Sequence, residues 1–143
     1  MDFKVFKIIL GIEIILLFLQ FWLGMSINLF YSVPQQTPFD FSSYAGGSVV
    51  LAHIIAGILI LLIAGLILSY SIRMKNTFLS AMLVGALVFA FVAPAAGYTF
   101  VLKGQNDGYS MAMAMSFLIA YTLYLSSFYL IGKSLDNKVL TAG

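Results

Sequence analysis

The chain has 143 residues, of which 62% are hydrophobic and 8% charged, with a net charge of +2 and no cysteine. Soluble domains average about 25% charged residues, so this sequence has too few polar side chains to cover a water-soluble globule. The absence of cysteine excludes disulfides and thiolate metal sites. The few cations form no clustered basic patch, so we expect no nucleic-acid partner.

Four apolar runs are each long enough to cross a bilayer. A helix rises about 1.5 Å per residue and the hydrocarbon core is about 30 Å thick, so roughly 18 or more apolar residues are sufficient. The runs cover about residues 5–30, 47–71, 78–102 and 110–132. Because they use nearly the whole chain, the sequence predicts one all-α domain over residues 1–143, in contact with the lipid bilayer.

The first run follows two lysines, as the apolar region of a signal peptide does. It exceeds the usual length of about 7–15 residues, and no clear small-residue cleavage site follows it. We therefore interpret residues 5–30 as a retained helix. The connections between the runs are short, which predicts antiparallel neighbours in an up-down-up-down four-helix bundle.

The cations predict the orientation of this bundle. Only Lys103 flanks one side, whereas the other side carries Lys4, Lys7, Arg73, Lys75, Lys133 and Lys138. Positive charge accumulates on the cytoplasmic side of membrane proteins. We therefore expect both termini in the cytoplasm and a multi-pass protein of the plasma membrane.

Small residues at intervals of four predict where the helices approach one another, because they let backbones pack closely in lipid. Such seams occur in the last two runs: Ala81 with Gly85, Ala86 with Ala90, Ala93 with Gly97, and Ala112 with Ser116 and Ala120. In the second run, Gly57 and Ala64 lie one heptad apart.

His53 is the only histidine, and it lies within an otherwise apolar run. An ionisable residue inside the membrane is a functional hypothesis by default, because placing it there costs a few kcal/mol. Counted along the helices, His53 lies in the outer half of the bilayer, at the depth of Met25 and Met115. Its other interpretation is a neutral imidazole that forms a hydrogen bond with a carbonyl or with Ser48.

Three features favour a haem beside His53. Gly57 lies one turn deeper on the same helix face and would leave room for a flat macrocycle. Met115 offers a thioether, which serves as the second iron ligand in histidine/methionine cytochromes. Lys103, with Tyr98 and Tyr109, could hold the propionates at the outer rim. Each feature has an ordinary packing interpretation as well.

The segments "LFLQFWLGMSINL" and "VVLAHIIAGILILL" together resemble one half of the haem A synthase family. That resemblance implies a four-helix, cytochrome b-like half in which His53 ligates haem. The family's second histidine, on the fourth helix, has no counterpart here, and Ile54 stands where an arginine is common. What the resemblance implies for this chain is therefore electron transfer or another haem-associated role, with a haem held by His53 alone or by His53 and Met115.

Two further functions stay open. Imidazole and thioether ligands also suit copper(I), so His53, Met25 and Met115 are a candidate copper or small-molecule site. Alternatively, the chain is a non-enzymatic subunit or assembly partner of a larger, respiratory-type complex, or a homo-oligomer, and its polar residues bond helices together.

Glu13 raises a separate question, because it lies within the first apolar run. Gln20, Gly24 and Asn28 continue its helix face outward at helical spacing. A proton or quinone-headgroup path along this stripe is one interpretation. The other is a neutral Glu13 that bonds Ser126 or Ser127 and joins the first helix to the fourth.

Overall fold

Four long helices make up nearly all of the structure, a computed structural model that describes residues 3–35 and 39–140. They are α1 (Phe3–Phe30), α2 (Gly47–Arg73), α3 (Thr77–Leu102) and α4 (Asp107–Leu140). All four are long and apolar enough to cross a membrane. The predicted all-α class with four apolar, membrane-length helices is thus confirmed.

The helix boundaries follow the predicted runs except in α4. This helix begins at Asp107 rather than near residue 110, and it continues to Leu140 rather than ending near residue 132. An acidic residue in the first turn complements the positive end of the helix dipole, which accounts for the early start. The apolar run ends near Lys133 but the helix does not, because a helix that leaves the membrane can continue with polar residues.

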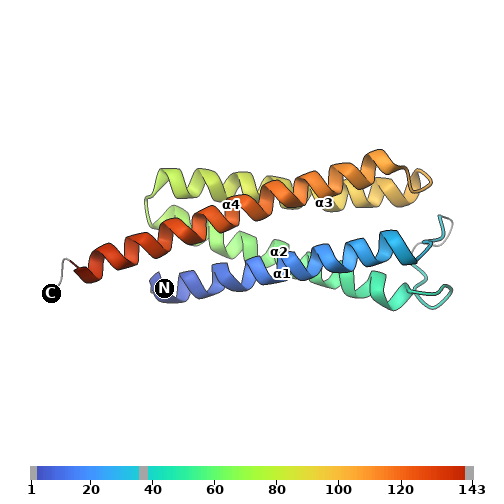
Figure 1. The fold of residues 1–143 in the computed structure, drawn as a ribbon, viewed down its shortest axis with the longest axis horizontal. Coiled ribbons are helices and arrows are strands. Elements are labelled where there is room, and N and C mark those ends of the chain that lie inside the picture. The colour runs from blue at the N-terminus through green and yellow to red at the C-terminus, as the bar shows by residue number, and fades with distance from the viewer. Residues whose placement is uncertain (1–2, 36–38, 141–143) are drawn as a thin grey trace.

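Each helix contacts its neighbours in the chain, and α1 also contacts α4. Successive helices run in opposite directions, as Figure 1 shows. Within the described residues, the diagonal pairs α1–α3 and α2–α4 make no close backbone contact. We call the end where α1 begins and α4 finishes the terminal end, and the opposite end, which holds the α1–α2 loop, the far end.

The interior of the bundle is apolar and tightly packed. Its largest cluster of buried side chains comprises Phe6, Leu10, Leu17, Ile60, Ala64, Ile67, Leu79, Leu83, Ala86, Tyr124 and Ile131. Two glycines of the predicted small-residue seams lie at helix contacts: a Cβ on Gly85 would be 3.3 Å from Leu123, and one on Gly97 would be 3.0 Å from the sulfur of Met113. These positions let α3 and α4 approach closely. Ala81, by contrast, is exposed.

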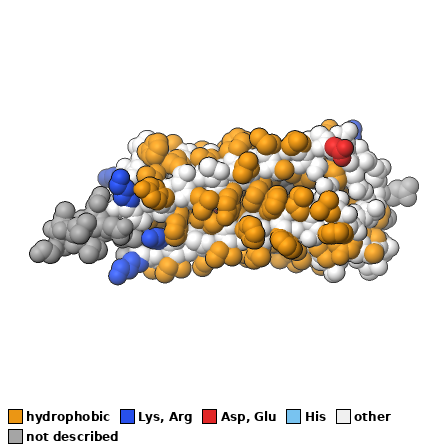
Figure 2. Space-filling model, in the orientation of Figure 1, with side chains coloured by type: hydrophobic (Ala, Val, Ile, Leu, Met, Phe, Trp, Pro, Cys, Tyr) orange, Lys and Arg blue, Asp and Glu red, His pale blue; other side chains and the backbone are white. Residues whose placement is uncertain are grey.

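The outside of the bundle is also apolar. Figure 2 shows hydrophobic side chains along the length of one face, with Lys and Arg at one end. Four exposed or half-buried hydroxyl groups are bonded within their own helix: Ser26, Ser69, Thr99 and Thr122 each donate to the carbonyl four residues earlier. A surface with apolar side chains and satisfied hydroxyls suits contact with lipid.

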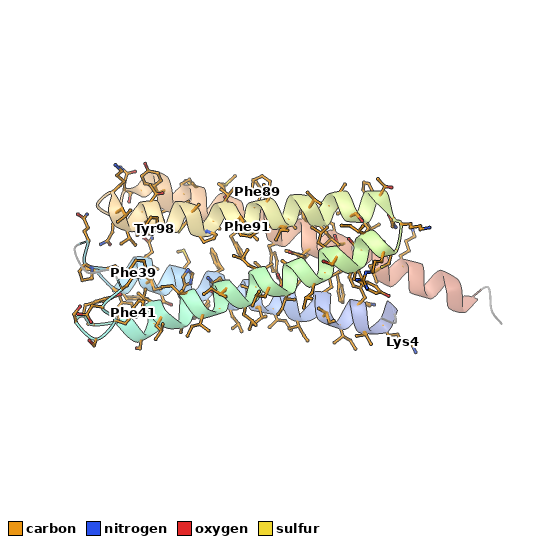
Figure 3. All side chains as sticks on the ribbon, turned by 180° about the vertical axis from the view of Figure 1, so that it is seen from behind. Lys4, Phe39, Phe41, Phe89, Phe91 and Tyr98 are labelled. Carbon is orange, nitrogen blue, oxygen red and sulfur yellow. The ribbon has the colours of Figure 1, made fainter. Side chains whose placement is uncertain are left out.

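The far end is held together by contacts between the α1–α2 loop and the α3–α4 pair. The side-chain amide of Gln105 donates to the carbonyl of Val33 at 3.1 Å. Phe39 stacks on Tyr98 with ring centroids 6.5 Å apart, and Figure 3 shows both at this end of the bundle. Gly46 has φ of +85° and packs against the Tyr31 ring, so a side chain there would meet both steric and backbone strain.

Candidate functional site

His53 lies at the contact between α1 and α2, where it meets Gln20. The Gln20 side-chain nitrogen Nε2 is 3.3 Å from His53 Nε2. That distance is at the long end of the range for a hydrogen bond. The single histidine is therefore engaged by a polar side chain of the preceding helix, an interhelical partner that sequence reasoning did not assign to it.

Two glycines make this contact possible. A Cβ on Gly24 would lie 3.0 Å from His53 Cε1, and a Cβ on Gly57 would lie 3.0 Å from Gln20 Nε2. Each polar side chain thus packs against the glycine of the opposite helix, and in each helix the polar residue and the glycine are four residues apart. We call these four residues the glycine interlock.

Gln20 and His53 form one hydrogen bond with each other, and each side chain keeps a second polar atom without a partner. An amide NH₂ can only donate, so His53 Nε2 accepts and the imidazole proton lies on Nδ1. Both Nδ1 of His53 and Oε1 of Gln20 are buried without a partner. The reversed amide orientation would exchange the donor and acceptor roles, and it too would leave one polar atom unpaired on each residue.

The space predicted for a macrocycle beside Gly57 is filled by the Gln20 amide. Nε2 of His53 faces that amide, and Nδ1 is enclosed at the helix contact. Neither ring nitrogen presents an open approach to a metal. The residues around His53 therefore do not fit a haem in this arrangement, and Gly57 has a packing role.

Met115 lies at the depth predicted for it but on a different face. The Phe21–Phe117 stacking contact, with centroids 4.6 Å apart, sets the α1–α4 register and brings Met115 level with Gly24. Its side chain is 50% exposed on the outside of α4, and the backbones of α4 and α2 make no close contact in the described residues. The structure therefore does not bring Met115 to His53.

The other predicted ligands are also dispersed. Met25 is 37% exposed on α1. Lys103 is exposed at the end of α3, where its backbone N–H donates to the Thr99 carbonyl. Among the described residues, no group of three histidine, cysteine, aspartate or glutamate side chains could hold a metal ion. Haem and copper binding therefore stay predictions without a converging set of side chains within one chain.

Glu13 is the second unusual polar residue, and it is fully buried. Neither carboxyl oxygen has a hydrogen-bond partner. The predicted bond to Ser126 or Ser127 is not formed. Ser127 donates its hydroxyl proton to the carbonyl of Leu123 in its own helix, and Ser126 lines a groove on the outside of the bundle. Glu13 is thus enclosed in the bundle without a hydrogen bond.

No family model, curated protein or solved structure matches this chain.

Proposed function

We propose that this chain is a non-enzymatic membrane subunit that packs against a transmembrane helix of a partner protein. The observation that supports this proposal most directly is the location of free space. The carboxyl oxygens of Glu13, Oε1 of Gln20 and Nδ1 of His53 are all buried, whereas a groove lies on the outer surface of the bundle. A bundle that encloses its polar residues and has a groove on its outer surface is suited to association with another helix.

The groove lies between α3 and α4 in the half nearer the terminal end, and its volume is about 520 Å³. It is lined by Phe78, Met82, Leu125, Ser126, Tyr129 and Leu130. Phe78 and Tyr129 are both about two thirds exposed, at 67% and 68%. Aromatic rings and methionine are typical of contact surfaces between proteins, and a serine adds a hydrogen-bonding group that a lipid chain could not use.

The charge distribution supports the proposed orientation, with the terminal end in the cytoplasm and a plasma-membrane location. Lys4, Lys7, Arg73, Lys75 and Lys133 belong to the helix ends and the loop at the terminal end. At the far end Lys103 is accompanied by Asp40 and Asp107. This asymmetry matches the positive-inside rule and an up-down-up-down path through the bilayer.

A photo-crosslinking amino acid at Phe78 or Tyr129 tests the proposed subunit role. In native membranes, both positions are expected to give an adduct with one and the same polypeptide, identified by mass spectrometry. The controls are Trp22 on α1 and Leu62 on α2, which are 66% and 63% exposed on other faces and are expected to give lipid adducts only. Lipid adducts alone at Phe78 and Tyr129 would refute the partner helix.

A visible spectrum separates this function from the haem-binding alternative. Protein purified in mild detergent from haem-replete cells is expected to show no Soret band, because both nitrogens of His53 are enclosed at the α1–α2 contact. The reduced-minus-oxidised difference spectrum is the measurement. A sharp α-band that disappears in His53→Ala would instead establish haem binding and would require the glycine interlock to open.

A further inference from the structure

Glu13 is fully buried inside the bundle, and other contacts define its level along the helices. Lys7 of α1 packs beside Gly132 of α4, and Gly11 of α1 packs beside Phe128 of α4. This antiparallel register brings Glu13 level with Ser126, so the neighbouring inward-facing positions of α4 are Tyr124 and Ser127. Both are fully buried, at 1% and 0% exposure.

The facing residues on α2 and α3 are small and apolar. The Gln20–Gly57 contact and the Phe6–Tyr70 ring contact set the α1–α2 register, which brings Ala64 level with Glu13. Ala86 of α3 belongs to the same buried cluster as Ala64 and Tyr124. Ala64 and Ala86 are 1% and 0% exposed, and neither side chain can bond a carboxylate.

Few charged or titratable groups face this carboxyl. From α4, Tyr124 is within electrostatic range of Glu13. The α2 face at this level holds Ala64, and its nearest titratable residue toward the terminal end is Tyr70, which packs on Phe6. On α1 itself, Lys7 is directed toward α4, with its Nζ 5.1 Å from the centroid of the Phe128 ring. No cation in the described residues is positioned to neutralise an ionised Glu13.

We propose that Glu13 is a proton-binding site inside the membrane, occupied in the closed bundle and emptied when the α1–α4 contact opens. The carboxylate form would be a buried charge without a hydrogen bond or counter-charge, which is costly in a low-dielectric interior. The protonated form is compatible with the closed packing around Ala64 and Tyr124. Loss of the proton therefore requires water or another polar group to reach Glu13, and protonation is linked to the packing of α1 on α4.

The proton bound by Glu13 can be detected with a lipid-soluble carbodiimide such as dicyclohexylcarbodiimide. The protonated carboxyl adds across one C=N bond of the reagent: an O–C bond forms, and the carboxyl proton moves to the reagent nitrogen. The resulting O-acylisourea rearranges by acyl transfer to a stable N-acylurea. No atom is lost and nothing is oxidised, so the modified peptide gains the mass of one reagent molecule.

We expect the protein in liposomes to be modified at Glu13, at a rate that falls as the pH on both sides of the membrane is raised. Glu13→Gln should carry no adduct. As a matched control for access, Ile12→Glu in the Glu13→Gln background places a carboxyl at the same depth on a position that is 46% exposed to lipid, and it should be modified as well.

Two results would overturn the proposal. One is no adduct at Glu13 although the Ile12→Glu control is modified, because the carboxyl would then never become available. The other is modification of Glu13 at a rate that does not change with pH, because the proton would then be permanent and the residue only structural. An infrared spectrum gives a readout that needs no reagent. The C=O band of the protonated Glu13 carboxyl, identified by its absence from the spectrum of Glu13→Gln, should weaken in the unchanged protein as the pH rises.

Discussion

Gly57→Leu is expected to separate α1 from α2 around the glycine interlock and to lower the free energy of unfolding by about 1–3 kcal/mol, the usual cost of overpacking a filled interior. The first added carbon alone would lie 3.0 Å from Gln20 Nε2. A leucine side chain is larger, so the whole amide would have to leave its place beside His53. Unfolding by SDS titrated into mild detergent, followed by helical circular dichroism, measures the change.

Gly65→Leu is the matched control, since it makes the same substitution in the same helix. A Cβ on Gly65 would meet nothing within 4 Å, so this variant should unfold like the unchanged protein. Adding Gln20→Ala to Gly57→Leu should recover part of the loss, because it removes the side chain that the leucine displaces. Equal effects of leucine at positions 57 and 65 would contradict the glycine interlock.

Glu13→Leu is expected to change stability in the opposite direction, raising the free energy of unfolding by about 1–3 kcal/mol, the penalty for a buried polar group without a partner. In SDS the separated helix can expose the carboxyl to the hydrated surface of the micelle, so folding must desolvate it. Leucine removes both unpartnered oxygens and adds an apolar side chain to an apolar interior. The same SDS titration measures this gain.

Leu17→Ala, one helical turn further along the same face of α1, provides the comparison. Leu17 is 4% exposed, and truncating a buried leucine costs about 2–5 kcal/mol. The two substitutions should thus move stability in opposite directions although both alter buried positions of one helix. A loss of stability in Glu13→Leu would show that the carboxyl has a stabilising partner in the folded protein and would count against its proposed exchange of a proton.

The four helices could be predicted from the sequence because length and apolarity determine which segments are able to cross a bilayer. Depth could be predicted as well, since it follows from counting residues: Met115 is level with the glycine interlock. The rotation of each helix could not be predicted, because an apolar residue is acceptable both in lipid and in the core. Met115 therefore faces outward, a result that its residue type alone does not determine.

The glycine interlock did leave a signal in the sequence. In α1, Gln20 is followed four residues later by Gly24, and in α2, His53 is followed four residues later by Gly57. In antiparallel helices, two such pairs can pack so that each polar side chain meets the glycine of the other helix. The sequence interpretation left the space beside Gly57 open, whereas the Gln20 amide occupies it. This could not be predicted, because the sequence of α2 does not determine which face of α1 packs against it.

The division of polar contacts among the helices has a consequence for biosynthesis. Gln20 and His53 bond each other across α1 and α2, so this pair is complete as soon as the second helix has been synthesised. Glu13 is enclosed only when α4 packs against α1. Because chains are made from the N-terminus, the carboxyl of Glu13 stays uncovered on its α4 side until α4 has been synthesised and has packed against α1.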